Sequence, residues 1–520
     1  MEFIFFKCQV ALLFLSLWIG FSVSTSFDEF LDCISKTTLS NIVFTPNDTL
    51  YSTVLQSTIQ NLRFDTPKPL AIITPLSYSH VQSTVICSVQ FGLNIRIRSG
   101  GHDYEGLSYT SFDHTPFILV DLNQLRSVKV DHPDTNTAWV ESGATLGELS
   151  YWVSQKSNLL GFPAGECPSV GVGGQISGGG FGMMARKYGL SVDNVIDALV
   201  VDVSGQILDR DSMGEDLFWA IRGGGGASFG VILSWKINLV YVPPIVTVFS
   251  VSKRLDQGAT RLVNKWQHIA HNVTEDLFIS LLVTPDQEEN IVTINSLFLG
   301  TANELVNIVS DGFPELGLQE KDCMEMSWIE SVVYFSIYLK GESVDALVER
   351  RPWPKTYFKV KSDYVKKPIP VEALEEIWKW CLQENVKLML EPHGGKMSQI
   401  DESAIPYPHR EGNLYIIQYI MSWDDDAASE KRAASMRRIY EKMTPYVSVN
   451  PREAYVNFRD LDLGTNGSAC CTNYGQAMSW GRRYFKGNFK RLAMVKGIVD
   501  PTNFFCNEQS IPPLVLSRSY

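Results

Sequence analysis

Hydrophobic and polar positions follow two different periods near the start of the chain. Residues 70–74 form a short apolar run, which is typical of a buried strand, and residues 77–90 carry apolar side chains at helical spacing. Residues 94–98 then alternate between apolar and polar positions, as a strand does. This order predicts a β-α-β unit. The glycines that follow its second strand predict a turn whose backbone N–H groups suit a pyrophosphate.

The pattern changes after Pro243 and Pro244, which we interpret as a domain boundary. Residues 277–283 and 291–298 have the pattern of strands, and the later segments 371–384 and 426–443 have that of helices. Strands followed by helices in this order predict an antiparallel sheet that is covered on one face. The expected fold class is therefore α+β.

Three glycine clusters predict a cofactor site. The segment 165–182, GECPSVGVGGQISGGGFG, holds eight of the 38 glycines, and the others are RSGGHDYEG at 98–106 and RGGGG at 222–226. Such density implies a backbone that bends sharply or approaches another group closely. Neither a G-x-G-x-x-G register nor a Walker lysine is present, which excludes the two commonest nucleotide loops. A glycine-rich surface loop around a buried thiol is the alternative.

The N-terminal residues predict entry into the secretory pathway. Residues 10–21 are apolar, which is too short for a bilayer that needs roughly 20 residues. A cleaved signal peptide over residues 1–26 is therefore favoured over a membrane anchor. Three Asn-x-Ser/Thr sequons, at Asn47, Asn272 and Asn466, agree with secretion and are candidate glycosylation sites.

Composition limits the classes of function. A chain of 520 residues predicts two domains, and 45% hydrophobic residues are ample for packed cores. A formal net charge of −12 argues against a nucleic-acid partner, because phosphate binding requires basic surface. No metal site is expected, since His393 and the adjacent Cys470 and Cys471 lack the spacing of metal ligands.

The glycine clusters, with SWKINLV, DYVKKPIP, NFRDLDLG and DPTNFFCNEQSIPP, resemble the plant berberine-bridge-enzyme-like flavoproteins, of the vanillyl-alcohol-oxidase type. The resemblance runs from about Phe27 to the C-terminus. It implies FAD attached twice, through His102 to the flavin 8α-methyl group and through Cys167 to ring carbon 6. A satisfied histidine and an inert cysteine are the alternative. Further residues expected to contact FAD are Arg98, Ser99, Gly100, Gly101, Asp103, Val170, Gly171, Gly174, Gln175 and Gly178.

The resemblance also implies an organisation of the chain. The expected parts are a signal peptide (1–26), a two-subdomain FAD-binding domain of the PCMH type (27–242), a substrate-binding domain (243–450) and a berberine-bridge-type segment that returns to the FAD domain (451–520). A disulfide between Cys33 and Cys87 is implied as well. Five cysteines then remain, and this odd number requires a free thiol or an intermolecular link: Cys323, Cys381, Cys470, Cys471 and Cys506.

Candidate catalytic residues come from the same resemblance. Tyr484 matches a tyrosine that acts as base in cannabinoid-synthase-like relatives, and its cationic neighbours Arg482, Arg483 and Lys486 are expected to stabilise a phenolate. A structural tyrosine on the flavin-facing wall is the alternative. Gln418 is expected to orient a substrate oxygen, and Tyr104 and Tyr109 are the next candidates for proton transfer.

Three residues depart from the family pattern. Ile416 stands where relatives often have glutamate or lysine, and Phe181 replaces a tyrosine. Gln175 replaces a histidine and offers only a neutral donor, so reduced flavin should be less stabilised. Val170, three residues after Cys167, matches a gate beside the oxygen-reactive carbon, where valine goes with oxidases.

The leading hypothesis is a secreted monomeric oxidase, in the apoplast or the vacuole. It takes two electrons from a small molecule, such as a phenolic, a prenylated aromatic or an alkaloid, and passes them to O₂ to give H₂O₂. The loss of polar groups at Ile416 and Phe181 favours a substrate less polar than a sugar. The alternatives are a non-redox cyclase that retains flavin, a carbohydrate or monolignol oxidase or dehydrogenase, and a secreted binding protein.

Overall fold

A computed structural model describes most of the chain, namely residues 25–37, 40–64, 67–112, 114–131, 135–336, 338–351, 354–467 and 473–515. The expected signal peptide lies outside the described residues, apart from Thr25 and Ser26, and so do Cys470 and Cys471. Within these ranges no helix combines the length and the apolar character needed to cross a membrane.

The predicted β-α-β unit is confirmed. It consists of β2 (Ala71–Ile73), α3 (Tyr78–Gln90) and β3 (Asn94–Arg98). A later strand, β4 (Phe117–Asp121), lies between β2 and β3 and is parallel to both, which local periodicity did not indicate. The short strand β1 (Val43–Phe44) completes the order β1-β2-β4-β3.

The expected disulfide is present: Cys33 and Cys87 are bonded, with their Cα atoms 6.0 Å apart, and join the N-terminal helix of residues 25–35 to α3. Cys506 is also disulfide-bonded.

A second sheet packs against α3 on the side away from the first. Apolar side chains of α3, including Val85, share one core with Ile73 of the first sheet and Val231 and Leu233 of the second. The second sheet is antiparallel and has the order β5 (Val128–Val130), β6 (Thr137–Glu141), β10 (Val231–Asn238), β8 (Val195–Val201) and β9 (Ile207–Leu208). Its associated helices are α4 (Leu146–Ser154), α5 (Val172–Ser177) and α7 (Arg210–Ile221).

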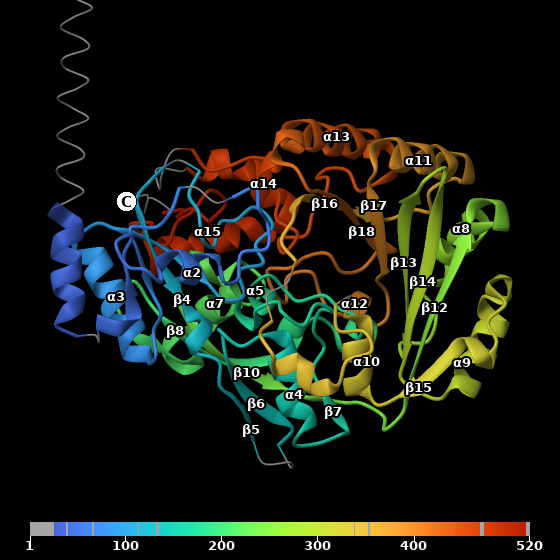
Figure 1. Cartoon of the computed structure of the whole chain (residues 1–520), viewed down its shortest axis with the longest axis horizontal. Helices are drawn as coiled ribbons and strands as arrows, with labels where there is room; N and C mark the ends of the chain where they lie inside the picture. Colours follow the sequence, from blue (N-terminus) through green and yellow to red (C-terminus); the bar gives the residue numbers. More distant parts are fainter. Residues whose placement is uncertain are drawn as a thin grey trace, which may run out of the picture.

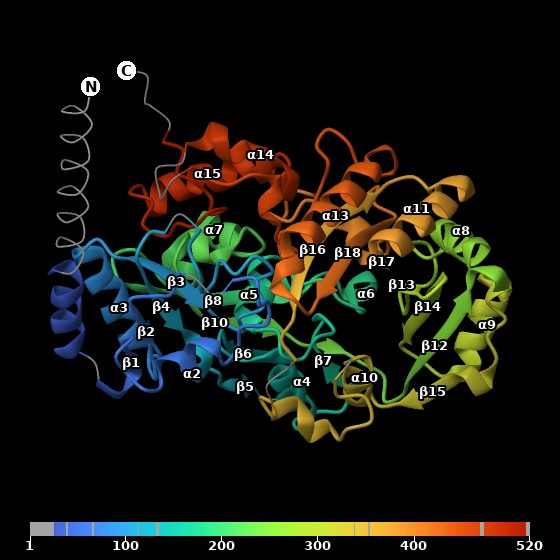
Figure 2. The ribbon, with the colours of Figure 1, turned by 45° about the horizontal axis from the view of Figure 1, so that its top comes forward.

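A seven-stranded antiparallel sheet forms the other half of the molecule (Figure 1). Its order is β15 (Cys323–Met326), β12 (Val246–Arg254), β14 (Glu289–Phe298), β13 (Leu277–Asp286), β17 (Lys387–Pro392), β18 (Tyr415–Trp423) and β16 (Tyr357–Val365). One face is covered by α8 (Ala259–Ile269), α11 (Val371–Glu384) and α13 (Ser429–Lys442), as Figure 2 shows. The expected α+β class, with helices on one face of an antiparallel sheet, is confirmed.

The C-terminal segment lies beside the glycine-rich half. Helices α14 (Tyr474–Phe485) and α15 (Asn488–Val499) follow the large sheet in sequence, and α15 packs on α7. The buried Lys496 ammonium group ties α15 to the turn that follows the glycine cluster at 222–226, because it donates to the Ser228 carbonyl at 2.6 Å; it also pairs with Asp500. The remaining short elements are α2 (Tyr51–Gln56), β7 (Leu160–Gly161) paired with β11 (Val240–Tyr241), α6 (Ala185–Tyr188), α9 (Ala302–Gly312), α10 (Trp328–Phe335) and α12 (Lys396–Gln399).

Candidate active site

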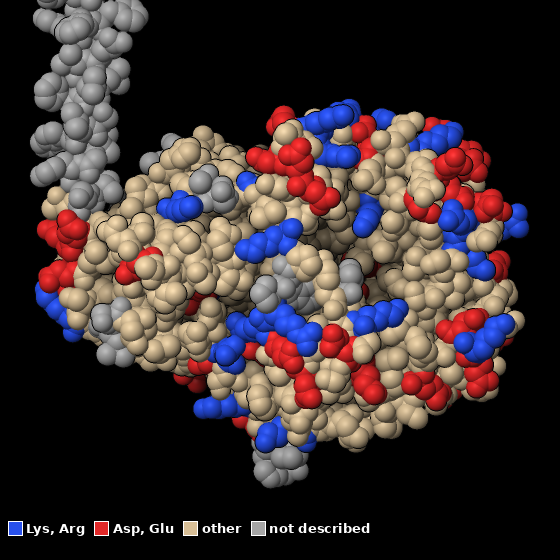
Figure 3. All heavy atoms as spheres, in the orientation of Figure 1, with Lys and Arg blue, Asp and Glu red and all other residues tan. Residues whose placement is uncertain are grey.

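A cavity of about 900 Å³ lies between the glycine-rich half and the large sheet. The turn after β3, the segment 165–182 and the glycines at 224–226 form one part of its wall, and β17 and β18 contribute Met389, Glu391, Gln418 and Ile420. The surface is hollowed near the middle of the face in Figure 3, where acidic and basic side chains are interspersed. The three glycine clusters predicted to form a cofactor cradle therefore meet around one space.

Two glycines allow the first two clusters to touch. The backbones of Gly100 and Gly171 approach so closely that a Cβ atom on either residue would overlap the other. Gly101 turns the chain with a φ of 70°, a conformation that favours glycine. This backbone-to-backbone contact brings the segment that carries His102 against the one that carries Cys167.

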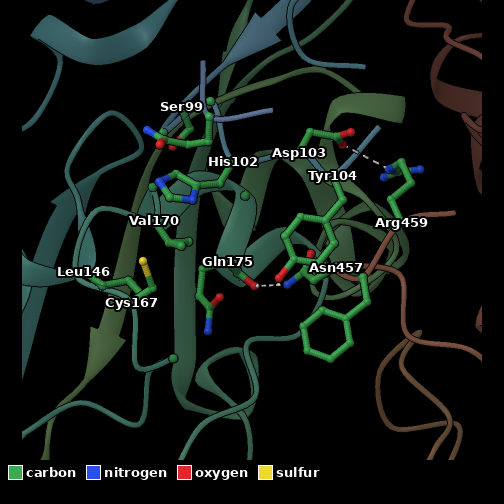
Figure 4. Close-up of a pocket in the computed structure, with 18 of the residues that line it drawn as sticks. Ser99, His102, Asp103, Tyr104, Leu146, Cys167, Val170, Gln175, Asn457 and Arg459 are labelled. Carbon is green, nitrogen blue, oxygen red and sulfur yellow. Dashed lines mark hydrogen bonds and ion pairs between the residues drawn. The ribbon is translucent and has the colours of Figure 1, made fainter. Parts of the chain in front are cut away.

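His102 and Cys167 converge on one hydroxyl group. The Ser169 Oγ atom lies 3.0 Å from His102 Nε2 and 3.4 Å from Cys167 Sγ. Burial lowers the pKa of His102 to about 4, so the imidazole is neutral at neutral pH, and burial raises the pKa of the Cys167 thiol. In Figure 4 both residues lie on the same side of the pocket, next to Val170. Two neutral nucleophilic side chains thus line the wall together.

The cavity wall fits a flat cofactor such as FAD. Gly174 lies within α5, and a Cβ atom added there would meet nothing within 4 Å, so this stretch of helix backbone is open to the cavity. Glycine in a helix costs about 1 kcal/mol relative to alanine, which close approach by a bound group would offset. Most of the residues expected to contact FAD line the cavity: Ser99, Gly100, Gly101, His102, Asp103, Cys167, Val170, Gly171, Gly174, Gln175 and Gly178. Arg98 does not; it is buried and pairs with Asp121 at 2.6 Å.

The C-terminal segment supplies wall residues that the sequence analysis missed. Asn457 donates from its side-chain amide to the Gln175 carbonyl at 3.0 Å, and the Arg459 guanidinium pairs with Asp103 at 3.2 Å (Figure 4). The Tyr455 hydroxyl accepts from the N–H groups of Gly180 and Phe181. These residues belong to or adjoin the NFRDLDLG motif, which pointed to the family but not to individual contacts.

Tyr104 and Gln418 form a polar pair at the cavity. The Gln418 amide Nε2 donates to the Tyr104 hydroxyl oxygen at 2.9 Å, across the space between the β3 turn and β18. The Tyr104 ring stacks on Phe458 and meets Phe358 edge to face. Burial raises the pKa of Tyr104, so the residue is a neutral phenol at neutral pH. The two side chains hold one another in place and present an O–H group to the cavity.

Tyr484 and Tyr109 are not brought to this cavity. The Tyr484 hydroxyl is buried beneath the C-terminal segment, where it accepts from the Asp460 N–H at 2.9 Å. Burial, followed by the charge of Asp460, raises the pKa of Tyr484, and Lys486 is engaged by Glu402 instead. The stabilised phenolate expected at Tyr484 is therefore corrected to a neutral structural phenol. Tyr109 is also buried away from the cavity lining.

The departures from the family pattern have distinct surroundings. Phe181 lines the cavity and stacks on His393, with ring centroids 5.1 Å apart. The Gln175 amide Nε2 donates to the Phe181 carbonyl at 3.3 Å, which leaves a neutral group at the cavity wall. Ile416 is buried on β18 and is not part of the lining.

Two carboxylic acids in the wall were overlooked. Glu166 directly precedes Cys167, and Glu391 lies on β17, with both side chains lining the cavity. Burial raises the pKa of Glu166 to about 7. Burial and then the charge of Glu166 raise the pKa of Glu391 to about 8. Glu166 lies in a motif whose prediction used only the glycines and the cysteine. The available signal for Glu391 was an acidic residue directly after the apolar run Leu388–Leu390 of β17.

The candidate glycosylation sites differ in exposure. Asn47 and Asn272 are exposed. Asn466 is buried, and its side-chain amide donates to the carbonyls of Asn507 and Ser510 and accepts from the Trp480 indole. The expectation for Asn466 is therefore corrected, because this amide has no room for a glycan in the folded chain.

Comparison with known proteins decides the family. Residues 69–210 match the model "FAD binding domain" and residues 454–512 match "Berberine and berberine like". The chain is 52% identical over 507 residues to tetrahydroberberine oxidase of Berberis wilsoniae, which covers 95% of each chain. It belongs to the berberine bridge enzyme-like family. The protein is accordingly an FAD-linked oxidoreductase.

Solved structures of relatives share the whole fold of this family member. The berberine bridge enzyme of Eschscholzia californica superposes with a TM-score of 0.88 at 42% identity, covering 94% of this chain and 99% of that one. The grass pollen allergen Phl p 4, described as having glucose dehydrogenase activity, superposes with a TM-score of 0.91 at 45% identity, covering 94% and 100%. Similar folds in the family thus carry different named activities, and the cavity residues of this enzyme must decide its own.

Proposed function

We propose that this enzyme is a secreted oxidase that removes two electrons from a small, largely apolar metabolite and passes them to O₂. The reaction converts the substrate and O₂ into a product two hydrogens poorer and H₂O₂. The observation that carries the proposal is the convergence of His102 and Cys167 on the Ser169 hydroxyl at the cavity wall. This arrangement supports a redox cofactor held by two covalent bonds, one through each side chain.

FAD, when bound, supplies two-electron redox chemistry. The chain itself holds the cofactor, orients the substrate and shields both from water. The glycine-rich segments allow the cofactor to approach the backbone closely. Asn457 and Arg459 attach the C-terminal segment to the same wall. Tyr104 keeps its proton at neutral pH, and Gln418 fixes the direction of its hydroxyl, so the pair can hydrogen-bond a substrate oxygen or nitrogen.

The lining favours an aromatic or aliphatic substrate over a sugar. Phe181, Phe358 and Phe458 line the cavity together with Met389 and Ile420. Apolar walls with a few placed polar groups are typical of sites for small organic molecules. Two relatives at 52% identity are named tetrahydroberberine oxidase and O-acetylstemmadenine oxidase, which agrees with oxidation of a small organic molecule.

A secretory location is supported by two observations. The Cys33–Cys87 disulfide suits an oxidising compartment, and the sequons at Asn47 and Asn272 are exposed. We propose that the mature chain reaches the apoplast or the vacuole and that these two asparagines carry glycans.

A second candidate is a cyclase that retains FAD without redox turnover. Tyr484 does not line the cavity, and Ile416 and Phe181 are apolar. The site therefore has few groups that can transfer protons. Ring closure depends more on orientation than on acid–base chemistry, so an apolar cavity suits it.

One experiment tests both candidates. Purified holoenzyme is mixed with fractions of a plant metabolite extract while O₂ consumption and product masses are followed together. An oxidase consumes O₂ and yields products about two mass units lighter. Anaerobic mixing with the active fraction then bleaches the flavin absorbance. Turnover to an isomer, with no O₂ consumption and no bleaching, overturns the oxidase and identifies the cyclase.

A further inference from the structure

Glu391 differs from every other buried carboxylate in the described residues. Nine aspartates and glutamates are buried, and eight of them form an ion pair with a basic side chain. Glu391 is 5% exposed and has neither an ion pair nor a side-chain hydrogen bond within the described part of the chain. An acid placed in a wall without compensation is costly, because burial removes its hydration.

Glu166 adds a second acid to the lining of the same cavity. Its Oε1 atom is buried and has no hydrogen-bond partner among the described residues. Its negative charge acts on Glu391, and both side chains line the cavity. The two residues come from different halves of the molecule, the glycine-rich segment and β17. Folding therefore assembles a carboxylic acid pair that no local sequence pattern requires.

The arginine and lysine side chains that line the cavity already have partners. Of those lining the cavity, Arg96 pairs with Glu508 at 3.1 Å and Arg459 pairs with Asp103 at 3.2 Å. Lys340 lies over the Tyr334 ring, with its ammonium nitrogen 4.6 Å from the ring centroid. The charge of Glu391 instead acts on two aromatic hydroxyls, those of Tyr104 and Tyr455. Among the described residues, no basic side chain forms an ion pair with Glu166 or Glu391.

We propose that Glu166 and Glu391 bind the ammonium group of a cationic amine substrate. This inference rests on the proposed oxidase function and narrows its substrate class. Carboxylates supply charge-assisted hydrogen bonds to an N–H⁺ group, and the rings of Tyr104 and Phe458 supply faces that attract a cation. Glu166 is bonded in sequence to Cys167, so an amine held there lies beside the residue proposed to anchor the flavin.

The proposal sets a preference among substrates of similar shape. An amine with an apolar body satisfies the acid pair and the aromatic wall together. A carboxylic acid of the same size places a third negative charge beside the pair and is rejected. Neutral alcohols gain the aromatic contacts but not the ionic ones.

Three probes of one shape test this preference by calorimetric titration of the holoenzyme at pH 8.5, above the pKa of about 7 for Glu166 and of about 8 for Glu391. They are benzylammonium, whose N–H⁺ group can donate to the carboxylates, benzyl alcohol and benzoate. We expect the ammonium probe to bind about 10- to 100-fold more tightly than the alcohol, the usual range for an interaction with a charged group. Benzoate should bind most weakly. Equal affinities for ammonium and alcohol overturn the proposal.

Single variants then locate the effect. Glu391→Gln and Glu166→Gln should each lower the affinity for the ammonium probe by about tenfold or more and leave benzyl alcohol unchanged. Glu349→Gln, which removes an exposed carboxylate that does not line the cavity, controls for net charge. Glu391→Asp keeps the charge and should retain part of the preference, which separates electrostatics from misfolding. An unchanged ammonium affinity in both glutamine variants refutes the site.

The test also distinguishes this proposal from the oxidase proposal. Glutamate-dependent ammonium binding without O₂ consumption on any amine leaves the site intact and removes the oxidase. Oxidation of neutral substrates that is insensitive to both glutamine variants leaves the oxidase intact and removes the site.

Discussion

Glu391 on β17 is the direct cross-strand partner of Ile416 on β18. Side chains of paired residues share a face of the sheet, and neighbouring strands lie about 4.8 Å apart. Position 416, where the family resemblance implies that relatives often have glutamate or lysine, is isoleucine in this chain. The structure places a carboxylic acid one strand away from that position. The cavity therefore has an acid on the neighbouring strand, because Glu391 on β17 lines it together with Glu166.

Covalent flavin attachment is the first prediction. His102→Ala and Cys167→Ala should each retain yellow colour after acid precipitation, because one bond remains in either variant. The double variant should release its FAD into the supernatant. Absorbance of the precipitate and mass spectrometry of flavin peptides measure the outcome. Release of FAD from the acid-precipitated wild type would refute both bonds.

The second prediction separates Tyr104 from Tyr484. Tyr104→Phe removes the hydroxyl that Gln418 orients and should lower turnover by about 10²- to 10⁴-fold, the usual contribution of acid–base catalysis. Tyr484→Phe removes a hydroxyl buried away from the cavity and should change turnover less than about tenfold. Gln418→Leu should also lower turnover, by a smaller factor than Tyr104→Phe. Turnover with a reactive amine, compared at equal flavin content, gives the ranking, and the reverse order would restore Tyr484 as the base.

The sequence predicted the cradle well because its signals are local. Glycines at 100, 101, 171 and 174 mark where the backbone must turn or must carry no side chain. The structure places them around one cavity. The strands and helices of the large sheet also follow from local periodicity, as the match of residues 371–384 to α11 shows. Insertion of β4 between β2 and β3 depends on long-range pairing, which periodicity does not encode.

Individual catalytic residues were harder to predict for the same reason. Tyr484 and its basic neighbours are close in sequence, but α14 turns the tyrosine inward and leaves Arg482 exposed. Glu166 and Glu391 are 225 positions apart in sequence and acquire a shared role only when β17 faces the glycine-rich segment. Burial is the main cause of the raised pKa of Tyr484, Glu166 and Glu391, and burial is a property of the fold.

The third prediction concerns acid stability and His393. Burial lowers the pKa of His393 to about 3, with His409 and Arg410 acting in the same direction and Glu453 opposing them. The folded pKa lies below the unfolded value, so stability is fully present above about pH 6.5 and falls as the pH drops toward 3. At pH 4.5 this one group should cost about 2–3 kcal/mol relative to pH 7.

His393→Gln removes that titration. The variant should lose less stability than wild type between pH 7 and pH 4.5, as measured by urea unfolding at both values. His268→Gln, at an exposed position, is the matched control and should follow the wild type. Parallel pH dependence in wild type and His393→Gln would contradict the assignment.

The fourth prediction concerns Asn466. Its amide accepts from the Trp480 indole at 3.1 Å and donates to two carbonyl groups, so Asn466→Ala leaves buried polar groups unpaired. The free energy of unfolding should fall by about 1–3 kcal/mol. Asn272→Ala, at an exposed sequon, should change it by less than about 0.5 kcal/mol. Glycopeptide mass spectrometry should find glycans at Asn47 and Asn272 and none at Asn466; a glycan at Asn466 would disprove its buried role.

The last prediction concerns access of O₂. Val170 lines the cavity beside Cys167, and its carbonyl accepts from the Leu146 N–H at 2.9 Å, which fixes its backbone. Protein interiors have few spare voids, so one extra methylene at this position can fill the space that O₂ would enter. Among the relatives, wild-type Phl p 4 is described as a glucose dehydrogenase and an isoleucine-to-valine variant of it as a glucose oxidase. A single valine can therefore accompany oxidase behaviour in this fold.

Air should reoxidise photoreduced wild-type holoenzyme rapidly, and Val170→Leu should slow this step by about tenfold or more, since 1.4 kcal/mol of added barrier is a factor of ten. The absorbance spectrum of the oxidised variant should stay unchanged, because the substitution adds only apolar volume. Gln175→His is the matched comparison: it changes the charge available at the cavity wall but not the volume at position 170. Stopped-flow mixing with air-saturated buffer measures both. The wild type could instead be reoxidised slowly, with Gln175→His accelerating the step and Val170→Ala leaving it unchanged. That result would show that electrostatics, and not access of O₂, limits the rate of reoxidation. It would also favour a dehydrogenase over an oxidase, because O₂ would then reach the site and still react poorly.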